Sequence, residues 1–382
     1  MVAALPLGQG ARPNVILVMT DDQGYPELSA HGNPVLNTPF LDKLHSQSVR
    51  FTDYHASPMV TPTRGSFMTG LAPARNGAIN VSSGRTLLRA NLPTMADLLR
   101  EQGYRTGIFG KWHLGDQPQH LPTAHGFDEY YGIPYSNDMD GVKGKDRNLH
   151  RAWIERDISP WNVPLLRNTK VIERPVNQNT IIERYTQEAQ QFIHSNKDKP
   201  FFLYMPHTMP HIPLFVSDKF YTKDPKKAYI RTIEEIDYSI GQVLKTLRET
   251  GVDDNTVVIF TSDNGPNLKG KKNVMYGKAQ GGRFNYTPIG SSGAYRGWKR
   301  DCYEGGLRMP GILEWPAKVK KPFAIDMATV TSDYFPTALD AAGIPLPADR
   351  EYDGISLMPL IEGRMDARKG AIGFHCRGMQ AW

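Results

Sequence analysis

The sequence is poor in the features that mark membrane proteins, disulfide-rich proteins and nucleic-acid-binding proteins. It contains no apolar run of about 18 residues, the length at which a segment becomes a candidate for crossing a bilayer, so we expect no membrane span. Two cysteines, Cys302 and Cys376, are too few for a disulfide framework. Residues 1–12 lack the basic and apolar regions of a signal peptide. There is no zinc-finger spacing and no long basic helix, so we expect no nucleic-acid partner.

The remaining composition is that of a globular protein with a large core. The chain has 382 residues, of which 40% are hydrophobic and 22% are charged. This length accommodates one large α/β domain, or one domain with a small partner. The net charge of +6 favours an anionic partner, because opposite charges attract over long range.

Apolar runs alternate with helical patterns along most of the chain. The expected strands cover residues 15–19, 49–54, 104–109, 201–205, 257–260, 311–315 and 325–330. The expected helices cover residues 38–48, 92–101, 180–196, 226–250 and 332–342. The alternation predicts a large, mostly parallel sheet between two layers of helices. Two stretches, 117–179 and 265–300, lack clear periodicity, and we expect both to form loops around a pocket.

Polar residues follow the apolar runs where strands should end. They are Asp21, Asp22, Lys111, His113, His211, Asp263 and Asn264. Taken singly, each is equally compatible with an ordinary helix cap, turn or loop residue. Ligands of parallel sheets bind outside the carboxyl ends of the strands, so the shared placement predicts one common site.

Four of these residues offer only oxygen ligands. Asp21 and Asp22 follow the first apolar run, and Asp263 and Asn264 follow a later one. Adjacent buried acids repel each other unless something cationic neutralises them. Oxygen ligands are typical of Ca²⁺ or Mg²⁺ sites rather than zinc sites.

Residues 55–70 predict an anion-binding helix N-terminus. The expected strand 49–54 precedes a turn, and Thr61 is expected to cap a helix that begins at Pro62. Helix N-termini carry partial positive charge, and Arg64 adds a cation one turn later. The alternative is a capped helix with a surface arginine.

A metal ion beside several cationic groups makes sense when an anion lies between them. The positive groups and proton donors would be Arg64, Lys111, His113, His211 and Lys299. Such a constellation describes the transfer of a sulfuryl or phosphoryl group, in which catalysis mainly stabilises charge on equatorial oxygens.

An ordered set of motifs carries a family resemblance. The motifs lie at residues 14–24, 61–64 with 68–70, 110–115, 126–135, 211–213 and 262–265, and at Lys299 with 304–306. With these motifs the chain resembles the formylglycine-dependent sulfatases of the alkaline-phosphatase superfamily, nearest the arylsulfatase A type. The resemblance extends from Pro13 to about Gly363. It implies hydrolysis of a sulfate ester on a carbohydrate or aryl group.

The resemblance also implies a role for each candidate residue. The implied ligands of Ca²⁺, with Mg²⁺ less favoured, are Asp21, Asp22, Asp263 and Asn264. Arg64 would steady the nucleophile and the metal ligands. Lys111 and Lys299 would bind sulfate oxygens. His113 would take a proton from the hydrated aldehyde, and His211 would protonate the leaving alcohol or phenol.

One position departs from the family signature Cys-x-Pro-x-Arg. The matching window begins at Val60, where the family has the cysteine that is oxidised to formylglycine. Valine has no nucleophilic atom and cannot form the aldehyde, so we expect the chain to bind a sulfate ester without turning it over. Val60 is either an engineered replacement or the mark of a natural glycan-binding pseudoenzyme. A phosphodiesterase that uses Thr61 as its nucleophile is a further alternative.

The resemblance has implications for partners, location and domains. An active cysteine form would need a formylglycine-generating enzyme or an anaerobic maturase. Family members are secreted or periplasmic. We expect residues 1–365 to form the catalytic domain. Family members usually continue into a small antiparallel subdomain, and we expect residues 366–382 to be its truncated start.

Overall fold

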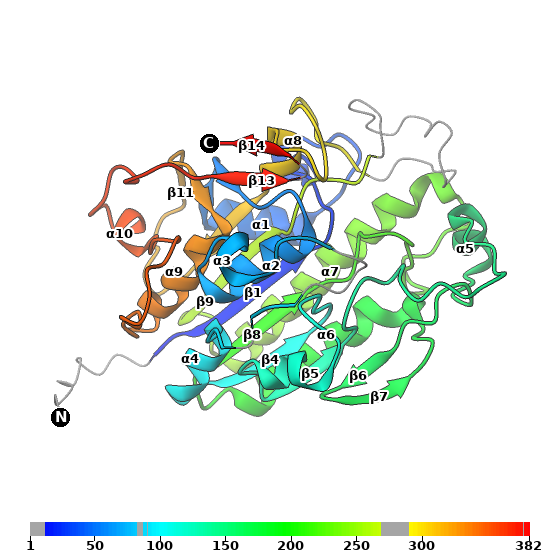
Figure 1. Cartoon of the computed structure of the whole chain (residues 1–382), viewed down its shortest axis with the longest axis horizontal. Coiled ribbons are helices and arrows are strands. Elements are labelled where there is room, and N and C mark those ends of the chain that lie inside the picture. The colour runs from blue at the N-terminus through cyan, green and yellow to red at the C-terminus, as the bar shows by residue number, and fades with distance from the viewer. Residues whose placement is uncertain (1–11, 82–86, 90, 269–289, 377) are drawn as a thin grey trace.

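The computed structural model describes residues 12–81, 87–89, 91–268, 290–376 and 378–382. A large sheet crosses the molecule, helices cover both of its faces, and a short hairpin forms the C-terminal end (Figure 1). Residues 1–11, most of the N-terminal stretch in which we expect no signal peptide, and most of the expected loop 265–300 lie outside the described residues.

The central sheet has ten strands in the order β11-β2-β10-β9-β1-β8-β4-β5-β6-β7. Its strands are β1 (Asn14–Thr20), β2 (Val49–Phe51), β4 (Arg105–Phe109), β5 (Glu129–Gly132), β6 (Leu165–Arg167), β7 (Lys170–Glu173), β8 (Phe201–Pro206), β9 (Thr256–Ser262), β10 (Gly311–Glu314) and β11 (Phe323–Ile325). The five strands from β9 to β5 are parallel, and β10, β6 and β7 pair antiparallel to their neighbours. The predicted large, mostly parallel sheet is confirmed.

Strand β1 shows why the sheet is buried on both faces. Ile16 and Val18 pack into one hydrophobic cluster, whereas Val15, Leu17 and Met19 pack into the other. Successive side chains of a strand point to opposite faces, so a continuous apolar run fits between two helix layers.

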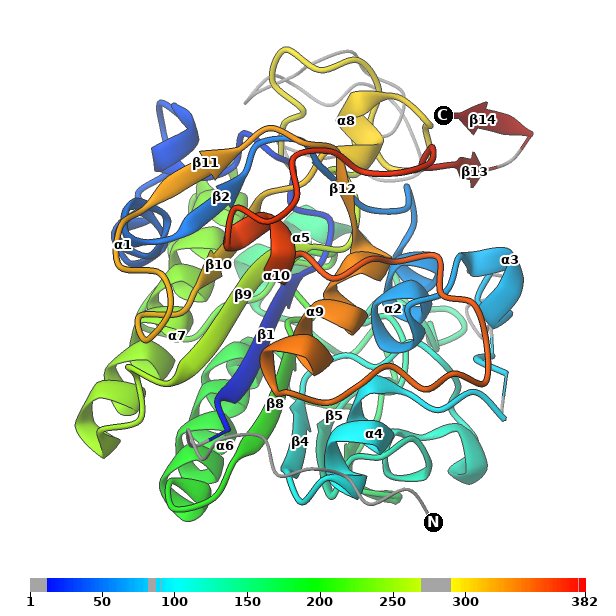
Figure 2. The same cartoon turned by 90° about the vertical axis from the view of Figure 1, so that its left-hand side faces the viewer.

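The two helix layers come from different parts of the chain. One contains α1 (Pro39–Gln47), α6 (Ile181–Asn196) and α7 (Ala228–Thr250), and the other contains α2 (Val60–Thr69), α4 (Met95–Glu101) and α9 (Tyr334–Ala341). Figure 2 shows α6 and α7 on one side of the sheet and α2, α4 and α9 on the other. The remaining α-helices of the described residues are α3 (Pro73–Asn76), α5 (Leu149–Glu155), α8 (Glu304–Leu307) and α10 (Met358–Ile361). Every helix expected from periodicity is present, with ends shifted by a few residues.

Four local predictions need correction. The stretch 117–179 is not irregular throughout, because it contains β5, α5, β6 and β7. Strand β7 lies at the sheet edge and is largely exposed, so it lacks the apolar pattern of a buried strand. The expected strand 49–54 is interrupted after Phe51, and β3 (Tyr54–His55) pairs instead with β12 (Thr329–Val330), which likewise breaks the expected strand 325–330.

The fourth correction concerns the start of α2. The helix begins at Val60 rather than Pro62, and its N-cap is Met59, which has extended backbone and no capping side chain. Thr61 therefore lies inside the first turn and does not cap the helix. Proline is tolerated in a first turn, because backbone N–H groups there have no partner within the helix.

The C-terminal residues form a separate small antiparallel sheet from β13 (Phe374–Cys376) and β14 (Met379–Ala381), visible at the top of Figure 1. Within the described part of the chain, every helix is too short or too polar to cross a membrane.

Candidate active site

Two neighbouring parallel strands bring the four oxygen-bearing residues together. In the register of β1 and β9, Thr20 pairs with Ser262, so Asp21 and Asp22 emerge beside Asp263 and Asn264. The backbone N–H of Asp22 donates to Asp263 Oδ1 at 3.2 Å, and Asn264 Nδ2 donates to Asp22 Oδ1 at 2.6 Å. Asp22 has a φ of 67°, a left-handed conformation that costs energy for a residue with a side chain. These contacts hold the strained residue in place.

The oxygen atoms left over in this cluster fit a hard cation. Asp21 Oδ1, Asp22 Oδ2 and Asn264 Oδ1 are buried and have no hydrogen-bond partner among the residues that the structure describes. A buried oxygen without a partner is costly, and a carboxylate even more so. Carboxylate and amide oxygens are typical Ca²⁺ ligands. The donor set therefore fits a divalent cation at this edge of the sheet.

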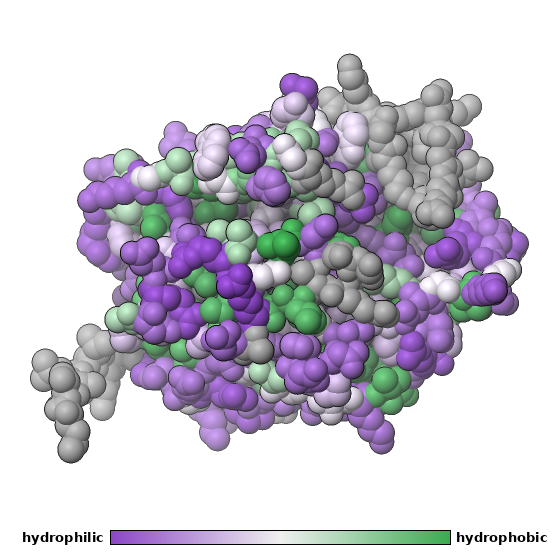
Figure 3. All heavy atoms as spheres, in the orientation of Figure 1, coloured by the Kyte–Doolittle hydropathy of each residue, from purple (hydrophilic) through white to green (hydrophobic). Residues whose placement is uncertain are grey.

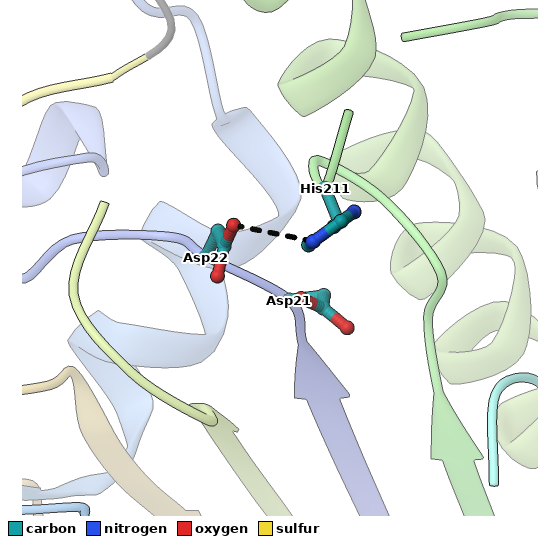
Figure 4. Close-up of side chains that lie close together, drawn as sticks. All are labelled: Asp21, Asp22 and His211. Atoms are coloured by element: carbon teal, nitrogen blue, oxygen red, sulfur yellow. Dashed lines mark ion pairs between the residues drawn. The ribbon is translucent and has the colours of Figure 1, made fainter. Parts of the chain in front are cut away.

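His211 completes the same cluster from the end of β8. Its Nε2 lies 3.8 Å from Asp22 Oδ2, and ligand atoms of Asp21, Asp22 and His211 all lie within 4.8 Å of one another (Figure 4). Its Nδ1 lies 3.1 Å from Asn137 Oδ1 and 2.7 Å from the carbonyl oxygen of Ile212. Both neighbours are acceptors, so Nδ1 carries the proton and the neutral ring leaves Nε2 as an acceptor facing the site.

Arg64 of α2 donates hydrogen bonds to residues that follow three strands, β1, β9 and β4. Its side chain is fully buried, and Nη2 donates to Asp21 Oδ2 at 3.0 Å and to Asp263 Oδ2 at 2.8 Å. Nε also donates to Asp263 Oδ2, at 3.1 Å, and Nη1 donates to the carbonyl oxygen of Lys111 at 2.5 Å. The surface-arginine alternative is therefore wrong. The forked guanidinium neutralises two acids and fixes the backbone that carries Lys111.

Two lysines lie against the same acids. Lys111 Nζ contacts Asp21 Oδ2 and donates to Ser136 Oγ at 2.9 Å. Lys299 Nζ lies 2.5 Å from Asp22 Oδ1. With Arg64, these lysines balance the charges of Asp21, Asp22 and Asp263. A divalent cation would give the site a net positive charge, which an anionic ester would offset.

The titration behaviour of the acids follows from burial and from these partners. Burial raises the pKa of Asp263 to about 7, with the Asp21 charge adding to the effect against Arg64 and Lys111. Burial also raises the pKa of Asp22, although Lys299 opposes it. Burial alone would raise the pKa of Asp21, but the charges of Lys111, His211 and Arg64 together hold this pKa below its usual value.

Burial also governs the basic groups. It lowers the pKa of Lys111 despite the Asp21 charge, whereas Asp22 and Asp21 overcome burial and raise the pKa of Lys299. Burial, with the charges of Lys111 and Arg64, keeps the pKa of His113 well below its ordinary value. Burial and the two lysines lower the pKa of His211 to about 3. Both histidines are therefore neutral near neutral pH.

Val60 lies at the N-terminal end of the face that carries Arg64. The two residues are four positions apart in α2, which places them on one side of the helix. Val60 is 2% exposed and presents only hydrocarbon. Thr61 is rotated about 100° around the helix from Val60. Its Oγ1 is buried and makes no hydrogen bond within the described residues.

The structure places all the candidates from the sequence at one edge of the sheet, and it adds two residues. Ser136 contacts Lys111, and Asn137 contacts His211. Both residues come shortly after β5, just as Asp21, Lys111 and Asp263 come shortly after their own strands. This position after a strand was the signal by which the sequence could have identified them. The weak periodicity of this stretch hid the strand.

Three comparisons with known proteins bear on this arrangement. A family model described as Sulfatase matches residues 13–344. Human steryl-sulfatase is 34% identical over 96% of this chain and 72% of its own length, and mouse N-acetylgalactosamine-6-sulfatase is 32% identical over 94% and 68%.

Two solved structures of known proteins have a similar fold. A protein from a Bacteroides thetaiotaomicron locus for metabolism of multiple glycosaminoglycans has a TM-score of 0.79 and 27% identity, covering 96% of this chain and 85% of that one. Ps i-CgsB, solved in complex with k-i-k-neocarrahexaose, has a TM-score of 0.74 and 27% identity, covering 92% and 77%.

Proposed function

Since the chain belongs to the sulfatase family, whose members hydrolyse sulfate esters, we propose that its site binds the sulfate ester of a carbohydrate or aryl group and that Val60 prevents turnover. The observation that carries this proposal is the juxtaposition of three unpartnered buried oxygens with Arg64, Lys111 and Lys299. A tetrahedral anion fits between a hard cation and such a set of basic groups. The carbohydrate assignment is supported by the relative and the solved complex whose names include sugars.

Ca²⁺ is the ion that we propose for the site, with Mg²⁺ less favoured. Its ligands would be Asp21, Asp22, Asp263 and Asn264, and when bound it would withdraw charge from a sulfate oxygen. The unpartnered oxygens on three of these residues support the assignment.

The basic residues would act on the rest of the ester. Lys111 and Lys299 would bind the other sulfate oxygens, and Arg64 would hold the acids and residue 60 in register. His211 would hold the ester oxygen that leaves, because Nε2 faces the site while Asn137 fixes the ring. An anion beside His211 favours its protonated form, so substrate binding would prepare it as a general acid. His113 would serve as the base at the nucleophile.

Residue 60 decides whether chemistry follows binding. In the family a cysteine at this position becomes formylglycine, whose hydrate supplies the nucleophile. Val60 offers no oxygen, so the site would hold an ester without attacking it. A natural pseudoenzyme that binds sulfated glycans and an engineered inactive form predict the same behaviour for this chain.

A phosphodiesterase that uses Thr61 is the second candidate. The observation in its favour is the buried, unpartnered Oγ1 of Thr61. Its position one residue from the face of Arg64 speaks against it. Loss of phosphodiester hydrolysis in a Thr61→Ala variant would support this candidate.

We also keep two broader proposals. Residues 1–365 would form the catalytic domain, a range that contains the family match over 13–344, and residues 366–382 would belong to a C-terminal subdomain. The protein would be secreted or periplasmic, as the family resemblance implies.

The test is to restore the nucleophile. Val60→Cys is produced together with a formylglycine-generating enzyme or an anaerobic maturase, and mass spectrometry verifies the aldehyde. We expect this form to hydrolyse 4-methylumbelliferyl sulfate. The matched control is Val60→Ala, produced in the same way, which cannot be converted. Folded protein with the verified aldehyde and no activity above that control would contradict the proposal.

A further inference from the structure

A second hollow is lined by residues on both ends of the segment 134–142 and by none of the candidate active-site residues. It has a volume of about 700 Å³, within the range of about 300–1,000 Å³ typical of small-molecule sites. Its walls come from the loop after β4, the segment 134–142 and the edge strands β6 and β7. Six of the residues that line it are Asp116, Pro134, Asp140, Leu166, Val171 and Arg174.

The segment 134–142 connects this hollow with the site. Its middle faces the site, because Ser136 contacts Lys111, Asn137 contacts His211, and the charge of Asp138 acts on His211. Its two ends line the hollow. Asp140 is three residues from Asn137, so their Cα atoms lie within about 11 Å of each other. A short oligosaccharide spans that distance.

The polar wall of the hollow is held in a fixed geometry. Arg174 Nη2 donates to Asp140 Oδ2 at 2.9 Å, and Arg174 Nε donates to the carbonyl oxygen of Asn162 at 3.0 Å. The hydroxyl of Tyr135 also donates to Asp140. The arginine side chain is 43% exposed, and these two bonds use only part of its five N–H groups. The fixed carboxylate of Asp140 can accept from one sugar hydroxyl, and the fixed guanidinium of Arg174 can donate to the next.

Apolar side chains also line the hollow. Pro134, Leu166 and Val171 line it, and Val171 is 45% exposed although it is hydrophobic. Figure 3 shows a small hydrophobic area at the lower right of this view, over β7, where Val171 and Ile172 are exposed. A sugar ring has polar edges and an apolar C–H face, so a lining that offers both polar and apolar groups matches it.

The charge of the hollow distinguishes it from the sulfate site. The charged residues lining it are Asp116, Asp140 and Arg174, and Arg147 lies beside Gly141 at its rim. Positive and negative groups therefore balance, and nothing favours a second sulfate. A neutral, hydroxyl-bearing ring is the ligand that these walls suit.

We propose that this hollow is a subsite for an unsulfated sugar of the same glycan whose sulfated residue occupies the active site. The subsite rests on the proposed function, and it narrows the substrate class to oligosaccharides or polysaccharides in which the sulfated sugar has a neutral neighbour. An aryl sulfate or a sulfated monosaccharide fills only the sulfate site.

Calorimetric titration of the Ca²⁺-loaded Val60 chain tests the subsite. The probes are 4-nitrophenyl sulfate and a panel of sulfated mono-, di- and tetrasaccharides from glycosaminoglycans and algal galactans. The panel includes pairs of oligosaccharides that differ only in the presence of a sulfate on the ring next to the sulfated sugar. We expect the singly sulfated oligosaccharide that binds most tightly to bind at least about tenfold more tightly than the corresponding sulfated monosaccharide. The reason is that its neutral ring would form charge-assisted hydrogen bonds in the hollow. A second sulfate on the neighbouring ring should remove this gain.

Variants assign the gain to the hollow. Arg174→Ala should abolish it by removing donors, and Val171→Trp should abolish it by filling the space, while 4-nitrophenyl sulfate binds both variants as before. Arg167→Ala is the matched control, because Arg167 lies on β6 but pairs with Glu188. It should leave the binding of both probe classes unchanged.

The remaining outcomes separate the two proposals. If oligosaccharides bind no more tightly than monosaccharides, or the gain survives both variants, the subsite is refuted while the sulfate site stands. If neither 4-nitrophenyl sulfate nor any glycan binds, the proposed function fails and the subsite fails with it.

Discussion

Replacing Arg64 by methionine tests whether the buried charges of the site act as one cluster. The change keeps much of the side-chain volume and removes the guanidinium that donates to Asp21, Asp263 and the carbonyl oxygen of Lys111. Breaking a buried ion pair by removing one partner costs about 3–5 kcal/mol, because the other charge stays buried without compensation. Domain stabilities are about 5–15 kcal/mol, so this variant should lose a large share of its folding free energy.

The assay is urea unfolding at pH 8 without added metal. A double-mutant cycle measures how much of the lost folding free energy comes from the contact between Arg64 and Asp263. Asp263→Asn removes the carboxylate that Arg64 contacts through two nitrogens. The double variant should therefore be less destabilised than the sum of the single variants, with a coupling energy of about 1–3 kcal/mol. Arg167→Ala removes an arginine whose side chain is 49% exposed and pairs with Glu188, and this control should cost less than about 1 kcal/mol. A loss for Arg64→Met no larger than for this control, or additive single variants, would refute the reasoning.

Two further predictions concern the metal and the anion. Burial raises the pKa of Asp263 from 3.8 to about 7, so without metal the folded chain holds a proton that the unfolded chain has released, and stability falls as pH rises from about 4 to 7. Because Ca²⁺ needs the carboxylate, its stabilisation in urea unfolding should be larger at pH 8 than at pH 5, and equal gains would contradict the ligand assignment. Lys299→Ala should weaken binding of 4-nitrophenyl sulfate by about 10- to 100-fold in calorimetry, through loss of a charge-assisted contact. Lys245→Ala, an exposed lysine that pairs with Glu249, should leave binding unchanged, and equal losses would count against a specific role of Lys299.

The sequence predicted the central sheet because its parallel strands are buried on both faces. Runs such as Val15 to Met19 are continuous and apolar, and the residues at their ends stand out by contrast. The edge of the sheet was not predictable in the same way. Strand β7 exposes most of its residues, so packing imposes no pattern on its sequence.

The start of α2 shows a second limit. Thr61 and Pro62 match the usual pattern of a cap followed by the first helical residue, yet Met59 holds the N-cap position and the helix begins at Val60. Tertiary contacts decide this boundary, because Thr63 donates to the carbonyl oxygen of Asp263 at 2.6 Å and Arg64 binds its carboxylate. Local propensity carries no record of contacts with a strand about 200 residues away.

The site itself was predictable in its residue types and not in its connections. Parallel topology alone implied that Asp21 and Asp263 would meet, since their strands end at one edge. The link from Asn137 to His211, and through the same segment to the second hollow, depends on how a loop folds back over the site. No periodicity encodes such a path.

The most direct test of the central claim is a crystal structure of the Val60 chain soaked with Ca²⁺ and a sulfate ester such as 4-nitrophenyl sulfate. We expect one ion bound by Asp21, Asp22, Asp263 and Asn264, with an intact ester whose sulfate oxygens contact the ion, Lys111 and Lys299. An ion held elsewhere, or an ester bound away from these lysines, would contradict it.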